Sequence, residues 1–223
     1  MPLMDEFKEE REKIKDASPE KKWKYFKDYY LKYVIAGGII LLVLIIFVVD
    51  MLTKKENMMT VMFVNFADQG TTTSNIEMPF TNEYLENPKR QEITVETNIF
   101  IPSGKSARTE VNYTYEDQQR FSMLLMAGEI DLMVSDEDFI MDLAAQEYVL
   151  TLDRVFTEDE LKPYTDRIVY YNNAPIAIRM DDNALINENL KYKGGNAEEL
   201  KVCAAFSSLK RLDMAKRFLK YMD

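Results

Sequence analysis

Six acidic side chains crowd one short stretch of this 223-residue chain. The stretch, residues 126–142, reads MAGEIDLMVSDEDFIMD and contains Glu129, Asp131, Asp136, Glu137, Asp138 and Asp142. Carboxylates at this density could bind a divalent cation or work as an acid–base pair. Their spacing does not fit a calcium loop, which needs D-x-[DN]-x-[DN]-G and a later glutamate. Adjacent acids on a helix also diverge around its axis, so they do not converge on one ion.

The same stretch has the pattern of a strand that leads into a helix. Residues 130–135 form a short apolar run, and apolar residues at helical spacing follow over residues 136–149. We expect Ser135 to cap this helix, because a serine oxygen can accept from the first free N–H groups. The acids at 136–138 would then occupy the first turn, where carboxylates complement the helix dipole. This structural interpretation is preferred, so no metal ligand and no catalytic residue is predicted.

Composition argues against several classes of function. The chain contains no histidine and one cysteine, Cys203, which excludes an internal disulfide and a thiolate zinc cluster. The net charge of −10 is unsuited to nucleic acid, whose phosphates require clustered lysine and arginine. Motifs of the GxSxG, HExxH and Walker types are absent from the sequence. We therefore predict that the chain is not an enzyme and takes no cofactor, and that Cys203 in KVCAAF is a buried structural thiol.

A transmembrane helix is predicted over residues 34–52. The run from Val34 to Val49 is apolar without a break, and about 20 apolar residues span the hydrocarbon core of a bilayer. A cleaved signal peptide is the alternative interpretation. The run begins late for a signal peptide, and no small-residue cleavage site follows it.

The lysines predict the orientation of this helix. Five lie close before it, at 21, 22, 24, 27 and 32, and only Lys54 and Lys55 follow it before Lys89. Positive residues favour the cytoplasmic side, so the N-terminus is expected in the cytoplasm. Residues 56–223 would then form an extracytoplasmic domain, in which acidic residues outnumber basic ones. The expected location is the cell membrane, with a single pass.

Residues 1–33 form a charged and aromatic juxtamembrane segment before the span, in which residues 5–15 are expected to form a short, highly charged helix. Ser18 and Pro19 mark the start of a helix, as an N-cap and a first helical residue. Aromatic residues three or four apart then share one face: Trp23, Phe26, Tyr30 and Tyr33. Lysines separate them, which is the composition of an interfacial helix. We expect this face to contact the lipid bilayer at its interface; a docking surface for a partner membrane protein is the alternative.

The remainder of the chain predicts an α/β or α+β domain. Strand patterns cover residues 60–67, 91–102, 109–115, 130–135, 167–171, 174–180 and 200–206. Helical patterns cover residues 118–128, 136–149 and 208–222, with a single helical turn within 80–88. Phe121 and Phe139 belong to the apolar stripes of the first two helices, and residues 68–75 are expected to form a loop. Thr157 and Glu160 have the spacing of a capping box, and Ser207 or Ser208 is expected to cap the last helix. Mixed strands with covering helices form a layered sandwich.

Two of these segments resemble a known family. The run LLMAGEIDLMVSDEDFIMDLAAQEYVLTLDRVF resembles the helix, "aGeiDv" strand and following helix of extracellular solute-binding proteins, which have the type 2 periplasmic-binding fold. The closing AAFSSLKRLDMAKRFLKYM is similar to their final helix. Before the span, KWKYFKDYY resembles small membrane-anchored proteins of clostridial Gram-positive bacteria.

The resemblance implies a reduced periplasmic-binding-like mixed sheet with covering helices. Solute-binding proteins have two lobes and are usually lipoproteins, whereas this chain is too short for two lobes and has a predicted transmembrane anchor. The ligand residues of the family have no matching motif here, so none is carried over. The implied function is a membrane-anchored binding or interaction module, or an accessory subunit of a membrane complex. A structural cell-envelope protein without a ligand and a hydrolase that uses acidic residues are the alternatives.

A small-molecule ligand would be expected near the carboxyl ends of the strands, where the crevice of an open α/β sheet lies. The candidate residues at those ends are Asn65, Asp68, Ser135, Asp136, Tyr171 and Asn172. Tyr171 and the two asparagines after it could supply stacking and hydrogen bonds without charge. The same three residues could also form a simple turn between two strands.

Overall fold

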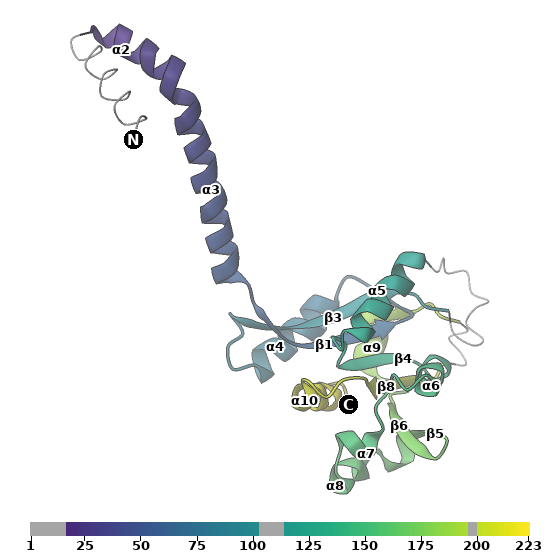
Figure 1. Cartoon of the computed structure of the whole chain (residues 1–223). Coiled ribbons are helices and arrows are strands. Elements are labelled where there is room, and N and C mark those ends of the chain that lie inside the picture. Colours follow the sequence, from purple (N-terminus) through teal and green to yellow (C-terminus); the bar gives the residue numbers. More distant parts are fainter. Residues whose placement is uncertain (1–16, 103–113, 196–199) are drawn as a thin grey trace. The chain divides into compact units, whose positions relative to one another are not determined.

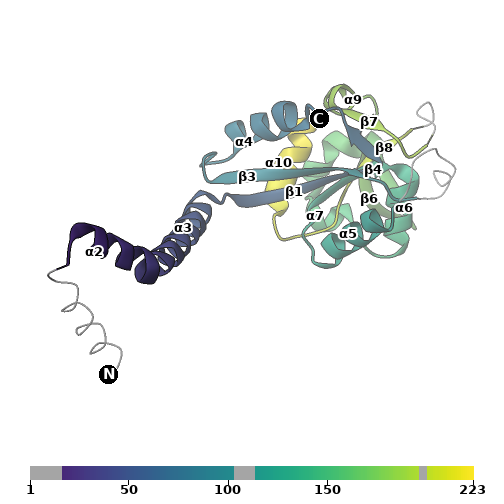
Figure 2. The same cartoon turned by 90° about the horizontal axis from the view of Figure 1, so that it is seen from above.

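The chain folds into two compact units, Met1–Lys54 and Lys55–Asp223, in a computed structural model that describes residues 17–102, 114–195 and 200–223 (Figures 1 and 2). The first unit is a helical segment made of α2 (Pro19–Tyr25), the π-helical turn η1 (Phe26–Tyr30) and α3 (Leu31–Thr53). As the sequence predicts, Ser18 stands at the N-cap and Pro19 begins the helix, although the Ser18 side chain makes no capping hydrogen bond. The predicted charged helix before Ser18 lies outside the described residues.

One helix in the described part of the chain, Pro19–Met51, is long and apolar enough to cross a membrane. None of its most apolar stretch is buried, and the large side chains from Val34 to Val49 are exposed. A membrane anchor and a signal sequence both have these properties. Because soluble proteins rarely expose an apolar surface of this extent, another apolar phase or partner must cover it.

The second unit is built on a six-stranded mixed sheet with the order β3-β1-β4-β8-β6-β5. Its strands are β1 (Glu56–Val64), β3 (Gln91–Ile99), β4 (Leu132–Asp136), β5 (Ile168–Tyr171), β6 (Ala174–Arg179) and β8 (Val202–Phe206). Strands β3, β1 and β4 are parallel, and β8 runs antiparallel to both β4 and β6. A smaller antiparallel pair joins β2 (Phe66–Asp68) to β7 (Leu190–Tyr192). The predicted α/β class with a mixed sheet is confirmed.

Helices cover both faces of this sheet. They are η2 (Thr73–Glu77), α4 (Met78–Tyr84), α5 (Tyr115–Met126), α6 (Glu137–Ala145), α7 (Leu152–Val155), α8 (Glu158–Leu161), η4 (Lys162–Arg167), α9 (Ala184–Asn189) and α10 (Leu212–Met222). Side chains alternate along β1, so Val61 and Phe63 pack with Phe218 of α10 in one core cluster. Met62 lies on the other face, in the cluster that holds Phe121 of α5.

Several helix boundaries differ from the expected ones. Helix α5 begins at Tyr115, because the Thr114 hydroxyl accepts from the Asp117 N–H at 3.0 Å and caps it there. The strand predicted over residues 109–115 lies almost wholly outside the described residues, and its last residue belongs to α5. The segment predicted as a loop up to Asn75 ends in the helical turn η2.

The predicted serine cap of the last helix is wrong. Helix α10 begins at Leu212, with Arg211 at the N-cap and no side-chain capping bond. Ser207 and Ser208 both precede the helix and make other hydrogen bonds. Ser207 donates to the Ile130 carbonyl at 2.7 Å, and Ser208 accepts from the Lys210 N–H at 3.1 Å. The capping box of Thr157 and Glu160 is confirmed in α8.

Phe218 tests the core beneath α10. Its ring is fully buried and meets the Phe80 ring edge-to-face at a centroid distance of 5.0 Å. Phe218→Ala is expected to lower the free energy of unfolding of the fragment 55–223 by about 3–5 kcal/mol, because it leaves a cavity. Urea unfolding measures this change. Leu209→Ala, at a side chain that is 47% exposed, is the control and should cost less than about 1 kcal/mol. Equal losses in the two variants would contradict this assignment of the core.

Candidate functional site

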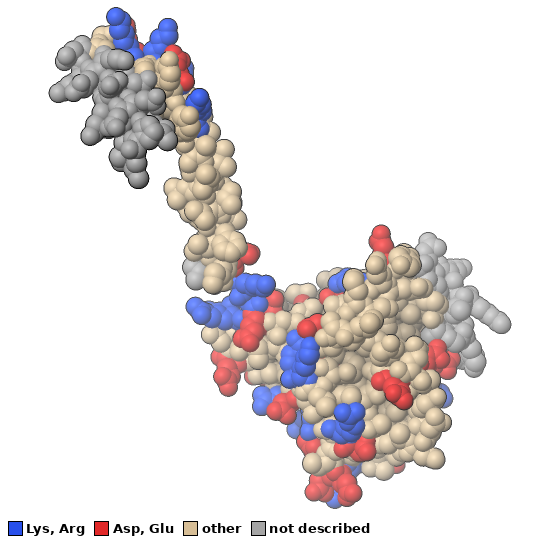
Figure 3. Space-filling view, in the orientation of Figure 1, with Lys and Arg blue, Asp and Glu red and all other residues tan. Residues whose placement is uncertain are grey.

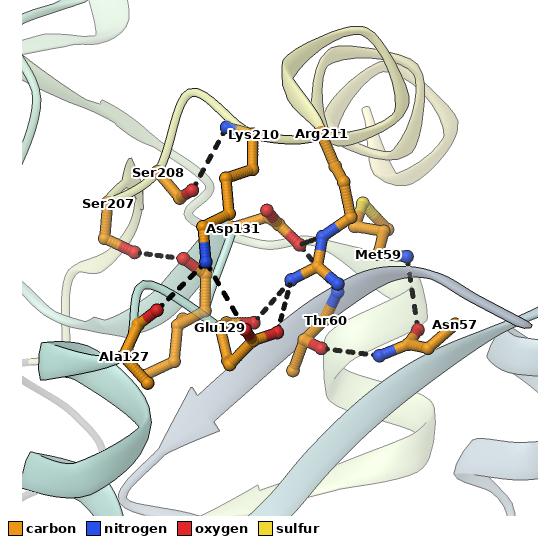
Figure 4. Close-up of polar contacts among 11 residues, drawn as sticks. Asn57, Met59, Thr60, Ala127, Glu129, Asp131, Ser207, Ser208, Lys210 and Arg211 are labelled. Atoms are coloured by element: carbon orange, nitrogen blue, oxygen red, sulfur yellow. Dashed lines mark hydrogen bonds and ion pairs between the residues drawn. The ribbon is translucent and has the colours of Figure 1, made fainter.

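The first half of the acidic stretch forms an ion-pair cluster around one buried carboxylate (Figure 4). Asp131 precedes β4, is fully buried, and accepts from the Thr60 backbone N–H of β1 at 2.8 Å. The Arg211 guanidinium lies 2.8 Å from the same carboxylate oxygen. Glu129, at the surface, contacts both Arg211 and Lys210 at 3.3 Å. These contacts join β1, β4 and the start of α10, which is a structural use of the two acids.

The second half of the stretch forms the junction between β4 and α6. Asp136 is the N-cap, and its carboxylate accepts from the Phe139 N–H at 2.9 Å. Glu137 lies in the first turn and pairs with Arg179 of β6 at 2.9 Å. The prediction of a strand that leads into a helix with acids in its first turn is therefore confirmed. Among the described residues, no group of three or more histidines, cysteines, aspartates or glutamates could hold a metal ion.

The predicted cap at Ser135 is wrong by one residue. Ser135 still belongs to β4, where it is opposite Cys203 of β8. Its hydroxyl donates sideways to the Val64 carbonyl of β1 at 3.0 Å. Asp136 instead has the extended backbone of an N-cap, with φ −68° and ψ 155°.

Three of the six candidate ligand residues come together at one sheet edge. Because β1 and β4 are parallel, their carboxyl ends meet, and Asn65 follows β1 beside Ser135 and Asp136. The Asn65 amide donates to the Asp136 carboxylate at 3.3 Å and accepts from the Ile101 N–H at 2.9 Å. Asn65 and Ser135 are fully buried and Asp136 is 7% exposed. Solvent therefore scarcely reaches this group.

The chain itself closes this edge. Asn65 has a positive φ of 66°, a conformation that asparagine tolerates better than most residues, and the chain turns there from β1 into β2. Its carbonyl accepts from the Lys193 N–H at 2.8 Å, which holds the segment after β7 over the strand ends. Gly194 fits only as glycine, since a Cβ there would lie 2.9 Å from the Asn65 Cβ and 2.7 Å from the Tyr192 hydroxyl.

The other three candidate residues lie apart from this group. The Asp68 carboxylate accepts from the Thr72 hydroxyl at 2.6 Å and from the Gly70 N–H at 2.9 Å. Burial raises the pKa of Asp68, but these hydrogen bonds outweigh burial, so the pKa lies below its usual value. Asn172, with the asparagine after it, forms the tight turn between Tyr171 of β5 and β6, with φ of 48° and 65°.

That turn lies at the opposite edge of the sheet. β6 runs in the same direction as β4, because each is antiparallel to β8. The turn precedes β6 and therefore lies near the edge where β4 begins. Tyr171 and Asn172 thus do not meet Asn65 or Asp136, and a role in ligand binding for any of the six residues stays a prediction.

A cavity of about 380 Å³ lies instead between α5 and α6. Its volume is within the range of small-molecule sites, roughly 300–1,000 Å³. The rings of Phe121 and Phe139 meet edge-to-face at 5.6 Å and lie at its apolar side. The lining is made by Ile101, Pro102, Gln118, Phe121, Ser122, Leu125, Met126, Phe139, Asp142, Leu143, Gln146 and Tyr148.

The chemistry of this cavity is an apolar body with a polar rim. Gln118, Ser122, Asp142 and Gln146 are exposed at the rim, and the Gln146 amide donates to the Asp142 backbone carbonyl at 3.0 Å. Asp142 alone is charged among the described lining residues. The arrangement suits a small molecule with an apolar portion and a neutral or cationic group that donates hydrogen bonds.

This cavity was not predicted from the sequence. The apolar stripes of α5 and α6 were expected, with Phe121 and Phe139 among their members. Spacing within one helix shows which side chains face the core, but it does not show how far apart two helices lie. The polar rim residues carried no signal of their own, since exposed glutamine and serine are ordinary on helix surfaces.

Cys203, by contrast, is the buried structural thiol that the sequence predicts. It is fully buried in β8, and burial raises the pKa of its thiol to about 12. A thiol in this state is inert, because the reactive species is the thiolate.

The buried Asp131 carboxyl predicts a pH-dependent stability. Burial raises its pKa above the usual value, although the Thr60 N–H and Arg211 act to lower it. The native state therefore binds a proton at the Asp131 carboxyl more tightly than the unfolded chain does. The stability that this bound proton contributes is lost as the pH rises through the raised pKa. Asparagine does not titrate, so Asp131→Asn should not lose this stability. The free energy of unfolding of the variant, relative to that of the parent, should therefore rise between about pH 4 and pH 7.

Urea unfolding of parent and variant at both pH values measures the difference. Glu129→Gln is the control, because it weakens a contact of Arg211 while it keeps the buried carboxyl. A relative stability of Asp131→Asn that stays constant or falls with rising pH would contradict this assignment.

No family model matches the chain, and no curated protein matches it. One solved structure that matches is the maltose/maltodextrin-binding domain MalE from Bdellovibrio bacteriovorus bound to maltotriose. The match has 16% sequence identity and a TM-score of 0.35, and covers 54% of this chain but only 27% of that one. This weak structural neighbour is a solute-binding protein, the class that the sequence resembles. A likeness at this level carries no argument about ligand or mechanism.

Proposed function

We propose that this protein is a binding module held at the outer face of a membrane by its N-terminal helix. The cavity between α5 and α6 is the observation that carries the proposal, because it combines a suitable volume with an apolar wall and a polar rim. The exposed apolar helix α3 supports the anchor. The lysines that precede α3 support a cytoplasmic N-terminus, and with it an extracytoplasmic domain.

The proposal assigns ligand binding without catalysis. Glu129, Asp131 and Glu137 are engaged in ion pairs, and Asp136 caps a helix. Carboxylates in such contacts serve the fold, and a carboxylate hydrolase needs a pair that converges on its substrate. In the proposed site Asp142 has a different task, which is to attract a hydrogen-bond donor or a cation to the rim.

Ligand binding is tested by thermal unfolding of the fragment 55–223 against neutral sugars, amines, amino acids and short peptides. A ligand that binds only the native state stabilises it by about 2.7 kcal/mol at a hundred times its Kd. For a domain of this size the Tm should rise by roughly 5–10 °C. A saturable rise identifies the ligand class, whereas no rise with any of the compounds counts against a small-molecule site.

Matched variants place the ligand in the cavity. Ser122→Phe fills the rim from α5 and is expected to abolish the rise in Tm. Met123→Phe, at the next residue, changes a 59% exposed side chain that does not line the cavity, so the rise should remain. An undiminished response in Ser122→Phe would show that the ligand binds elsewhere.

The anchor and its orientation are tested in intact cells. Cys203 is buried, and Cys203→Ala gives a cysteine-free background for single cysteines at Ser18 and Asp138. A membrane-impermeant thiol reagent should label Asp138→Cys and leave Ser18→Cys unlabelled until the cells are opened. The reverse labelling would overturn the orientation, and release of the protein by alkaline carbonate would overturn the anchor.

A further inference from the structure

The segment before the apolar run that begins at Val34 carries an unusual density of aromatic and basic side chains. We call this segment, residues 19–33, the arm. Its aromatic residues are Trp23, Tyr25, Phe26, Tyr29, Tyr30 and Tyr33, and its basic residues are Lys21, Lys22, Lys24, Lys27 and Lys32. Trp23, Tyr29 and Tyr33 are more than half exposed. Within the described residues, the arm thus presents exposed aromatic surface.

Five of the rings form one connected surface. Trp23 stacks on Phe26 at 5.7 Å, and Phe26 stacks on Tyr30 at 6.3 Å. Tyr25 stacks on Tyr29 at 4.6 Å. These two rows are joined by Tyr25 and Tyr30, whose ring centroids are 5.8 Å apart.

The π-helical turn η1 makes this connection. Tyr25 and Tyr30 are five residues apart, a spacing that a π turn places on the same side and a regular α-helix does not. The sequence predicted one face of Trp23, Phe26, Tyr30 and Tyr33. The structure stacks the first three, adds the second row, and places the Lys32 ammonium 5.2 Å from the Tyr33 ring centroid.

The length of the arm limits how it can meet a membrane. A helix rises 1.5 Å per residue, so Trp23 lies about 16 Å of helix before Val34, where the apolar run begins. The headgroup layer on each side of a bilayer is only about 5–8 Å thick. A straight helix along the membrane normal would carry Trp23 beyond that layer into water. The rings all reach the interface only if the arm bends toward the plane of the membrane.

The structure provides a bend at the required position. Helices commonly kink at π turns, and α2 turns away from the line of α3 at η1 in both views (Figures 1 and 2). In Figure 3, the blue side chains of Lys and Arg lie along the arm, and the tan, uncharged surface of the run 34–49 follows them. Only Glu20 and Asp28 oppose the five lysines, so the arm carries net positive charge.

We infer that the arm lies in the plane of the membrane and recognises anionic phospholipid headgroups. The aromatic surface rests at the boundary of headgroups and acyl chains, and the lysines attract the phosphate and the net negative charge of the lipid. This inference rests on the proposed membrane anchor, since α3 brings the arm to the bilayer. It adds a lipid class that the anchor alone does not specify.

Trp23 is the one tryptophan of the chain, so its fluorescence reports on the arm alone. The test places the full chain in nanodiscs of phosphatidylcholine, with or without about one third phosphatidylglycerol. With the anionic lipid, the rate constant for acrylamide quenching of Trp23 is expected to fall at least about twofold, and the emission maximum to shift to the blue. High salt should reverse both changes, because the attraction is electrostatic.

A matched pair of variants separates the arm from the rest of the chain. Lys24→Gln with Lys27→Gln should remove most of the response to anionic lipid. Lys54→Gln with Lys55→Gln removes the same amount of charge beyond the other end of α3. This second double variant should leave the response to anionic lipid unchanged.

Trp23 quenching that is equal in both lipid compositions, or an equal response in both double variants, overturns the inference. In either case the lysines of the arm would not recognise anionic lipid. Failure of the anchor itself is a separate result, since the full chain would then not remain in nanodiscs of either composition.

Discussion

Two buried aspartates, one at each end of β4, determine how the second unit is put together. Asp131 accepts a hydrogen bond from the β1 backbone and pairs with Arg211. Asp136 caps α6 and accepts a hydrogen bond from the Asn65 amide. A buried carboxylate is costly unless it is paired and hydrogen-bonded. The surrounding backbone must therefore adopt one arrangement at both ends of the strand. That arrangement sets the register of β1 against β4, the start of α6 and the approach to α10.

The same constraint explains why the strand ends do not form an open crevice. Once Asp136 and Asn65 are paired, the chain after β7 lies over them, held by a backbone hydrogen bond and by the close approach of Gly194. The cavity described above lies elsewhere, between α5, which follows Thr114, and α6, which follows Asp136. Open α/β sheets bind ligands outside the carboxyl ends of their strands. Here those ends are filled by the protein's own chain.

Local sequence patterns predicted most elements and fewer of their contacts. The strand before Asp136, the helix after it and the capping box at Thr157 follow from short-range spacing, and each is found. The caps at Ser135 and at Ser207 or Ser208 were misplaced because a serine hydroxyl has other backbone partners besides its own helix. Ser135 and Ser207 donate to carbonyls of distant segments, and Ser208 accepts within its own loop. The cavity and the closed edge could not be read from the sequence, since both depend on residues far apart in the chain.

The π turn in the arm was missed for a related reason. A pattern of aromatic residues at spacings of three and four fits a regular helix, and nothing in that spacing reveals one extra residue in a turn. The insertion changes which rings are neighbours, so Tyr25 and Tyr29 join a surface expected to hold Phe26 and Tyr30. A small departure from helical periodicity thus brings a second row of rings into the aromatic face.

The position of β1 between β3 and β4 has a consequence for the order of folding. The strand leaves the ribosome before β4, because its contact with Asp131 joins residues 71 positions apart, and β4 must in turn wait for Phe206 of β8. Contacts of such long range form slowly, because the chain between them must be ordered first. During synthesis the apolar residues of β1, such as Val61 and Phe63, would remain uncovered until the last helix emerges. A nascent chain of this kind depends on rapid completion, or on a chaperone, to avoid pairing with other unfolded chains.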